Sequence, residues 1–384
     1  MFRPARPSPP AVARTPFRPQ RVLMTADTVG GVWTYALDLC RGLERAGISV
    51  VLATMGPPPR PAQRAAAARL RRLVLVESTY RLEWMEDPWA DVCAAGGWLL
   101  SLAKRHRVDL VHLNGFAHAA LPWDVPVLVA AHSCALSWWE AVKNEPAPSS
   151  WRHYAATVGR GLRAADLVVA PTQAHLTATR RLHGPLRSSR VIPNGRDAAM
   201  FVPSAKHDFI LGVGRLWDAA KNAAALVQIA PDLPWPVRLA GDTGTIGRVA
   251  IPANVSYLGA CACATLARHY ADAAVFAEPA FYEPFGLAAL EAGLAGCALV
   301  LGDIPSLREV WRDAAYYVPP DRPEMLRSML LGLIQDPARR ATMGARARAR
   351  ARQFTVERMT AGYLRAYRDL LAPARRSPGD PLPR

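Results

Sequence analysis

Short, continuously apolar runs alternate with helix-like segments along most of this 384-residue chain. A strand that is apolar at every position has both faces covered, which is typical of a parallel sheet packed between helices. Two neighbouring parallel strands also need a crossover connection, usually a helix. The alternation therefore predicts an α/β fold with doubly wound parallel sheets.

The alternation occurs in two series. The expected strands of the first series are 21–25, 49–53, 73–76, 109–113, 127–130, 167–170 and 191–192. Those of the second are 209–213, 237–240, 255–258, 274–277, 298–301 and 315–318. The chain is also too long for one ordinary α/β core. We therefore predict two Rossmann-like domains, 21–195 and 208–355, joined by the polar linker 196–207.

The two ends of the chain differ from this pattern. Residues 1–20 are rich in Pro and Arg, which predicts a disordered leader. They lack the central apolar stretch of a signal peptide, so no secretory signal is expected. Residues 356–384 predict a helix that packs back toward the first domain, followed by a Pro-rich tail. No apolar stretch is long enough for a membrane span. The cysteines form no Cys-x-x-Cys pair, so we expect a cytoplasmic protein and leave open peripheral contact with the inner membrane face.

The chain is strongly basic, with 47 Lys and Arg against 31 Asp and Glu and a formal charge of +16. Such a charge suits phosphates, acidic lipid headgroups or nucleic acid. A nucleic-acid-binding protein is therefore one alternative. The basic residues do not cluster with exposed aromatics in a recognisable stacking module, so we do not expect a nucleic-acid partner.

The most specific motif is Phe281–Leu287, which follows the apolar run 274–277. Pro284 suits the first turn of a helix, because its missing N–H would be unpaired there. Gly286 lets a ligand approach the backbone. We expect a helix N-terminus whose free amides form an anion site, namely those of Phe285, Gly286 and Leu287.

Two carboxylates accompany this motif, Glu283 in the loop and Glu291 two helical turns later. Both can accept hydrogen bonds from hydroxyl pairs, on a sugar ring and on a ribose. The structural alternative is that Glu283 caps the helix and Glu291 is a surface charge.

A second motif opens the second domain, where Gly214 and Arg215 follow a strand and Lys221 comes next. Two cations at the carboxyl edge of a sheet could hold a diphosphate and stabilise its charge as it leaves. The alternative is that Arg215 pairs with Asp218 and Lys221 is solvated. The third glycine of a dinucleotide fingerprint is absent, so no nicotinamide cofactor is implied.

Two weaker signals lie in the first domain. Gly30 and Gly31 form a strand-to-helix turn that would let the backbone approach a phosphate or sugar. His132 follows the strand 127–130 and would point into the cleft, although a lone histidine is more often structural.

Together these motifs resemble the retaining family-4 glycosyltransferases, which have the GT-B fold of two Rossmann-like domains facing a central cleft. The resemblance covers residues 21–370 and is carried by segments in the family's order: Gly30-Gly31, His132, Ile192-Pro193-Asn194-Gly195, Gly214-Arg215-Leu216, Lys221-Asn222 and Glu283 to Glu291.

The resemblance implies a retaining, metal-independent transfer of a sugar from a nucleoside diphosphate to an acceptor hydroxyl, with no cofactor beyond the donor. It implies four catalytic residues: His132 near the reacting carbon, Arg215 and Lys221 on the diphosphate, and Glu283 on the sugar. Glu291 would hold the ribose. The remaining donor-binding residues would be Gly30, Gly31, Asn194, Gly214, Phe285, Gly286 and Leu287.

The acceptor stays open at this point and can be a glycan, a lipid or a small molecule. The first domain of such a transferase usually takes the acceptor, and it holds most of the tryptophans: Trp33, Trp84, Trp89, Trp98, Trp123, Trp138, Trp139 and Trp151. Core packing is the expected role for most of them, and the alternative for some of these rings is stacking on an acceptor sugar or aglycone. The alternative functions are a nucleotide-sugar epimerase or hydrolase on the same fold, and an inactive sugar-binding scaffold.

Overall fold

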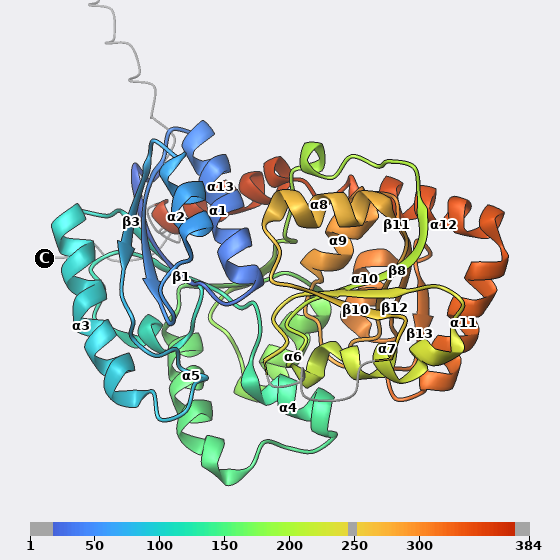
Figure 1. Cartoon of the computed structure of the whole chain (residues 1–384). Helices are drawn as coiled ribbons and strands as arrows, with labels where there is room; N and C mark the ends of the chain where they lie inside the picture. The colour runs from blue at the N-terminus through green and yellow to red at the C-terminus, as the bar shows by residue number, and fades with distance from the viewer. Residues whose placement is uncertain (1–17, 245–251, 373–384) are drawn as a thin grey trace, which may run out of the picture.

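A computed structural model of the chain describes residues 18–244 and 252–372. The Pro-rich tail beyond residue 372 and the predicted leader, apart from residues 18–20, lie outside this part of the chain. Figure 1 shows two lobes, each built around a sheet with helices on both faces. The predicted α/β architecture with two Rossmann-like domains is confirmed.

The first domain holds a seven-stranded sheet in the order β3-β2-β1-β4-β5-β6-β7, and its pairings are all parallel. Its strands are β1 (Arg21–Asp27), β2 (Ser49–Met55), β3 (Leu73–Glu77), β4 (Leu110–Leu113), β5 (Val127–Ala130), β6 (Leu167–Ala170) and β7 (Ser189–Val191). Its helices are α1 (Gly31–Arg45), α2 (Pro61–Ala68), α3 (Trp89–His106), α4 (Ala135–Lys143), α5 (Arg152–Ala164) and α6 (Gln173–His183). Strands β4, β5 and β6 are buried at every residue, as their unbroken apolar runs predict.

The second domain repeats this plan with a six-stranded parallel sheet in the order β10-β9-β8-β11-β12-β13. Its strands are β8 (His207–Val213), β9 (Val237–Ala240), β10 (Val255–Gly259), β11 (Ala273–Glu278), β12 (Ala298–Gly302) and β13 (Tyr316–Val318). Its helices are α7 (Ala223–Ile229), α8 (Cys263–Asp272), α9 (Leu287–Leu294), α10 (Pro305–Trp311), α11 (Pro323–Gln335) and α12 (Pro337–Ala351). In both sheets the strand order reverses beside the first strand, and doubly wound folds bind ligands at the carboxyl ends of the strands at that point.

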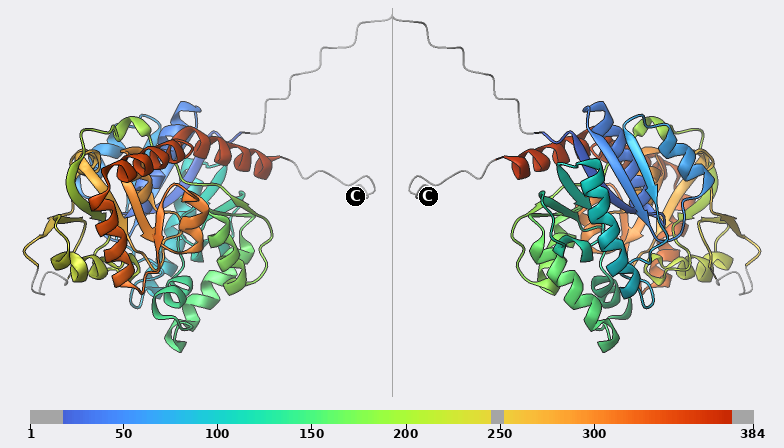
Figure 2. Two further views of the ribbon diagram at one scale, coloured as in Figure 1. Left: turned by 90° about the vertical axis from the view of Figure 1, so that its right-hand side faces the viewer. Right: turned by 90° about the vertical axis from the view of Figure 1, so that its left-hand side faces the viewer.

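The last helix, α13 (Val356–Leu371), crosses back and packs on α1 of the first domain. Figure 2 shows it as the long red helix along the edge of the molecule. Tyr363 and Tyr367 on this helix are buried in the core of the first domain. The crossing is close at Gly42, where a Cβ would lie 1.9 Å from the hydroxyl oxygen of Thr360. The contact between α1 and α13 therefore requires a residue without a side chain.

We predict that Gly42→Ala destabilises the protein by about 1–3 kcal/mol, because the added methyl overpacks this crossing. Gly97→Ala in α3 is the matched control, since a Cβ there meets nothing within 4 Å. Alanine in a helix is favoured over glycine by roughly 0.5–1 kcal/mol, so the control should be neutral or stabilising. Urea unfolding of both variants measures the difference. Equal stability of the two variants would contradict the close packing of α1 on α13.

Candidate active site

Three polar side chains meet where strands of the first sheet end. Asp27 is the last residue of β1, and its carboxylate accepts a hydrogen bond from the Val29 amide at 2.8 Å. Asn114 follows β4 and donates its Nδ2 to the carbonyl of Thr25 at 2.6 Å. That bond turns the Asn114 Oδ1 toward the Nε2 of His132, 2.9 Å away. His132 therefore lies at the carboxyl edge of the sheet, with its Nε2 as a hydrogen-bond donor.

His132 is held as a neutral ring. Burial, together with the nearby His175, lowers the pKa of His132 to about 3. The His132 ring also packs edge-on against Tyr35, with the ring centroids 4.3 Å apart. At neutral pH this side chain can bind a hydroxyl but carries no charge. Asp27 shows the opposite shift, since burial raises the pKa of its carboxyl to about 6.

Arg215 reaches the same place from the second domain. Its guanidinium pairs with Asp218, with Nη2 2.7 Å from Oδ2, so the alternative pairing considered from the sequence is the one observed. The side chain remains 38% exposed, which leaves part of the guanidinium open to the cleft. A Cβ on Gly30 would lie 3.1 Å from the Arg215 Nη1, and one on Gly31 would lie 3.3 Å from a methyl of Leu287. The Gly30-Gly31 turn thus faces two of the predicted donor residues across the cleft.

Lys221 lies between two carboxylates with a side chain only 16% exposed, so the solvated alternative is wrong for this residue. Its Nζ donates to the Glu278 Oε1 at 2.8 Å and also forms an ion pair with Glu283. Burial lowers the pKa of Lys221, but the two carboxylates outweigh burial and raise it above its ordinary value. The stem of Lys221 packs on Gly214, where a Cβ would lie 3.4 Å from the lysine Cγ. Lys221 is therefore a fixed cation at the end of β11.

The loop before α9 corrects two expectations. Helix α9 begins at Leu287 after Gly286, whose φ is +89°, so Pro284 precedes the helix instead of lying in its first turn. The amides of Phe285 and Gly286 are not free, because they donate to the Glu283 Oε1 at 3.2 and 2.8 Å. Burial raises the pKa of Glu283, but Lys221 and these two amides outweigh it and hold the pKa below its ordinary value. Glu283 is thus an anion on the α9 N-terminus.

Glu291 lies on α9 but is not a surface charge. Its carboxylate forms an ion pair with Arg196, whose Nε lies 2.8 Å away. Arg196 also binds Asp38 of α1, and both of these side chains are almost fully buried. The backbone amide of Arg196 donates to the Phe354 carbonyl at 3.1 Å, where the chain returns to the first domain. This Asp38–Arg196–Glu291 network joins the two domains at the crossover.

Asn194 stands apart from the other predicted donor residues. It is buried, and next to it Gly195 packs so closely on the returning chain that a Cβ would lie 2.1 Å from the Thr355 carbonyl oxygen. Within the described part of the chain, the Asn194 side chain forms no hydrogen bond with the other site residues. The sequence places it beside the crossover, and its role in donor binding stays a prediction.

Sequence reasoning missed several of these groups. Asp27, Asn114 and Glu278 each lie at or just after the end of a strand, so the rule that ligands bind at the carboxyl edge could have found them. Arg196 carried no such signal, because its partner Asp38 is 158 positions away in the chain.

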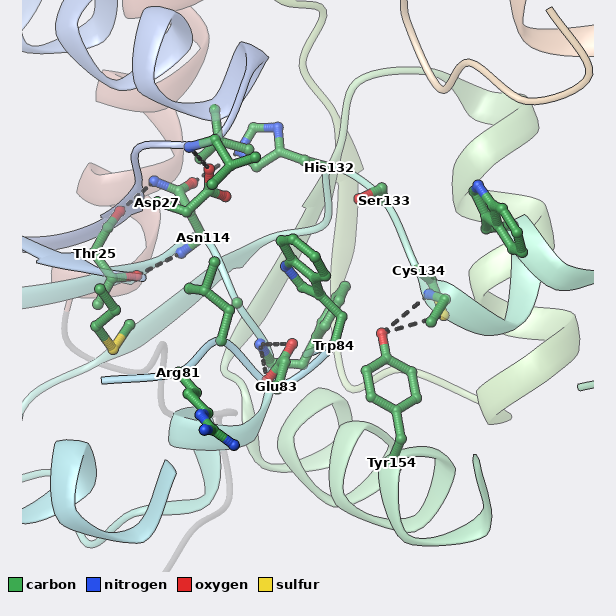
Figure 3. A pocket seen from close by; sticks show the side chains of 18 of the residues that line it. Thr25, Asp27, Arg81, Glu83, Trp84, Asn114, His132, Ser133, Cys134 and Tyr154 are labelled. Atoms are coloured by element: carbon green, nitrogen blue, oxygen red, sulfur yellow. Dashed lines mark hydrogen bonds between the residues drawn. The ribbon is translucent and has the colours of Figure 1, made fainter. Parts of the chain in front are cut away.

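Side chains from the two domains close the cleft. The indole Nε1 of Trp138 donates to the Asp218 Oδ1 at 2.9 Å, and the Tyr282 hydroxyl lies 2.8 Å from the hydroxyl of Ser137. Both domains line a cavity of about 340 Å³ in the cleft. The residues in its walls include Asp27, Asn114, His132, Arg215, Trp217 and Tyr282. Figure 3 shows Asp27, Asn114 and His132 together on one side of this cavity.

Comparison with solved structures defines the class of this architecture. Sucrose-phosphate synthase from Thermosynechococcus elongatus superposes with a TM-score of 0.77 at 20% identity, covering 92% of this chain and 99% of that one. HepE from Anabaena in complex with UDP-glucose superposes with a TM-score of 0.74 at 20% identity, covering 91% and 100%. These neighbours, with the two sheets facing one cleft, define a GT-B glycosyltransferase fold.

Sequence comparison gives the family. The Glycosyltransferase Family 4 model matches residues 29–199, and the model for glycosyl transferases group 1 matches residues 207–336. The D-inositol 3-phosphate glycosyltransferase of Kineococcus radiotolerans is 28% identical over 89% of this chain and 92% of its own length. That of Xylanimonas cellulosilytica is 29% identical over 88% and 91%. The chain belongs to the family-4 glycosyltransferases, as its motifs predict.

None of the helices within residues 18–244 and 252–372 is both long enough and apolar enough to cross a membrane.

We predict that Arg196→Met destabilises the protein by about 3–5 kcal/mol, because it leaves the buried Glu291 without its cation and Asp38 with Arg41 alone. Arg45→Met is the matched control. Arg45 also bridges α1 to a second element through Glu357 on α13, but both side chains are more than 60% exposed. Such a surface pair contributes about 0–1 kcal/mol. Thermal unfolding should separate the variants clearly, and similar melting temperatures would show that the buried network adds little.

We also predict a pH-dependent stability from Asp27. Because the folded carboxyl has a raised pKa near 6, the folded protein holds a proton that the unfolded chain has lost, and stability falls as pH rises toward and through 6. Asp27→Asn removes this loss, so the variant should gain about 2 kcal/mol relative to wild type between pH 4 and 7. Urea unfolding across this pH range measures the difference. A difference that stays constant with pH would show an unshifted Asp27.

Proposed function

We propose that the chain transfers a sugar from a nucleoside diphosphate to an acceptor hydroxyl with retention of the anomeric configuration. The observation that carries the proposal is the convergence of Arg215 and the Gly30-Gly31 turn at the cleft, beside the site of Lys221 and Glu283. A flexible cation facing a glycine turn suits a diphosphate. HepE, which shares the fold, was solved with UDP-glucose, and this supports a nucleotide-sugar donor.

Binding of the donor would change the partners of the charged side chains in the site. The diphosphate would take the Arg215 guanidinium from Asp218, and Lys221, held by Glu278, would offset charge on the same group. Glu283 leaves the α9 amides to bind sugar hydroxyls, which frees the Phe285 and Gly286 amides for an oxygen of the donor. Each exchange replaces one ion pair or charged hydrogen bond with another. Asp218, which loses its cation in this exchange, keeps the hydrogen bonds that its Oδ1 accepts from the Trp138 indole and the Ala220 amide.

The chemical step breaks the bond between the anomeric carbon and the diphosphate oxygen. The acceptor oxygen forms its bond on the same face, and the departing phosphate oxygen takes the acceptor's proton. The products are the glycoside and the nucleoside diphosphate. Arg215 and Lys221 stabilise the negative charge that develops on the leaving group, which is the effect that usually dominates such sites. His132 is neutral and binds a sugar hydroxyl near the reacting carbon without repelling an oxocarbenium-like centre.

We predict that Arg215→Ala lowers kcat by at least roughly a hundredfold, the usual loss for one transition-state contact. Arg308→Ala is the control, because Arg308 forms a similar pair with Asp303 in the same domain but does not line the cavity. A thermal-shift screen against UDP-, GDP-, ADP- and TDP-sugars first identifies the donor, and NMR then gives the anomeric configuration of the product. Near-normal turnover in Arg215→Ala would remove this mechanism.

The configuration of the product tests the second half of the proposal. Retention is expected, and an inverted product would contradict same-face transfer. Isomerised donor in the absence of any acceptor would instead identify an epimerase on the same fold.

A further inference from the structure

The cleft cavity has one polar end and one aromatic wall. Asp27, Asn114 and His132 form the polar end, next to Arg215, and Figure 3 shows Trp84 and Tyr154 lying away from them. The aromatic wall, as defined here, comprises Trp84, Trp138, Trp139, Trp151 and Tyr154. Four of these rings form a continuous row, in which the centroid distances from Trp138 to Trp139, Trp139 to Trp151 and Trp151 to Tyr154 are 5.8, 6.2 and 5.3 Å.

Part of the wall is open to a ligand: Tyr154 belongs to the first-domain core and Trp151 packs against it, but Trp84 does neither. Trp33 and the indoles of α3 pack into or against the first-domain cores, whereas Trp84 is 40% exposed and borders the cavity. An indole that remains exposed inside a cavity offers a flat apolar face at low conformational cost. The expectation that most of the first-domain tryptophans pack in the core agrees with Trp33, Trp89, Trp98, Trp123 and Trp151, whereas Trp84 and Trp138 border the cavity.

The cavity is lined by two cationic side chains, Arg81 and Arg215, against three carboxyl groups. Arg215 is paired with Asp218 and faces the donor side. Arg81 donates to the carbonyl of Glu86 at 3.1 Å and has a side chain that is 55% exposed. The two lining histidines, His118 and His132, have lowered pKa values because they are buried.

The lining carboxyl groups would repel an anion further. They are Asp27, Asp218 and Glu83. Glu83 is fixed in place, since it accepts hydrogen bonds from the amides of Phe116 at 3.0 Å and Ala117 at 2.8 Å. Burial raises its pKa, and a carboxyl group held in this way can still accept a hydrogen bond from a ligand hydroxyl. The lining thus combines a fixed acceptor of hydroxyl hydrogen bonds with a flat apolar wall.

We infer that this cavity binds the acceptor and that the acceptor is an uncharged alcohol with a flat apolar face, stacked on the aromatic wall and hydrogen-bonded to Glu83. This inference rests on the proposed function, because it names the substrate class of the same cleft. It separates the chain from its relatives named for D-inositol 3-phosphate, since a phosphorylated polyol would meet carboxyl groups and indoles here. The flat face can belong to an aromatic ring or to a pyranose.

Three probes on one scaffold test the inference: p-nitrophenyl β-glucoside, its 6-phosphate and methyl β-glucoside. Intrinsic tryptophan fluorescence of the full chain reports binding directly, so the result does not depend on knowing the donor. We expect p-nitrophenyl β-glucoside to quench the fluorescence and its 6-phosphate to bind at least tenfold more weakly. Equal or tighter binding of the phosphate would overturn the inference, as would no binding of either uncharged glucoside. Methyl β-glucoside shows whether the flat face is the aromatic ring or the pyranose. It binds as well as p-nitrophenyl β-glucoside only if the wall stacks on the sugar.

Variants assign the effect to the cavity. Trp84→Ala should weaken binding of p-nitrophenyl β-glucoside at least tenfold, whereas Trp84→Phe keeps a flat ring and should restore most of it. Binding unchanged in Trp84→Ala would overturn the inference. With the donor in hand, the same glucosides are tested as acceptors. Transfer to the 6-phosphate alone would overturn the inferred acceptor class and leave the transferase function intact. Donor binding without transfer to any acceptor would instead count against the proposed function.

Discussion

A buried arginine in the crossover sets how the two sheets face one another. Arg196 lies in the segment that connects β7 of the first domain to β8 of the second. Its ion-pair partners come from both domains, namely Asp38 on α1 and Glu291 on α9. Three charges in a nearly water-free position are tolerable only if the geometry keeps them together. A relative rotation of the domains would separate Glu291 from Arg196 or Arg196 from Asp38. The network therefore favours the arrangement in which the carboxyl edges of both sheets meet.

The remaining charges of the cleft follow the same rule. Lys221 is compensated by Glu278 and Glu283, and Glu283 is compensated again by two amides at the start of α9. Low dielectric makes each of these pairs strong, and it makes any unpaired member expensive. The charged side chains that are buried, such as Lys221 and Glu283, gain a new partner only by giving up an existing one. A site built from strong ion pairs could in this way bind the proposed charged donor, which would replace an anion that the protein itself supplies.

The fold could be predicted from the sequence because parallel strands covered on both faces leave an unbroken apolar run. The runs 127–130, 167–170 and 237–240 coincide with β5, β6 and β9. The start of α9 was predicted less well, because Gly286 adopts a left-handed φ and delays the helix beyond Pro284. Motifs placed the charged residues at the correct edge, but they could not give their partners. The pairing of Arg196 with Asp38, or of Glu283 with Lys221, depends on contacts between segments that only the folded chain brings together.

The same contacts link the acceptor side of the cleft to the donor side. Asp218 accepts one hydrogen bond from Trp138 of the aromatic wall and holds Arg215 with its other oxygen. If the donor diphosphate draws Arg215 away, Asp218 loses its cation and its hydrogen bond to the indole becomes its main charge-stabilising contact from the first domain. A single carboxylate therefore contacts both the aromatic wall and the cation proposed for the donor diphosphate.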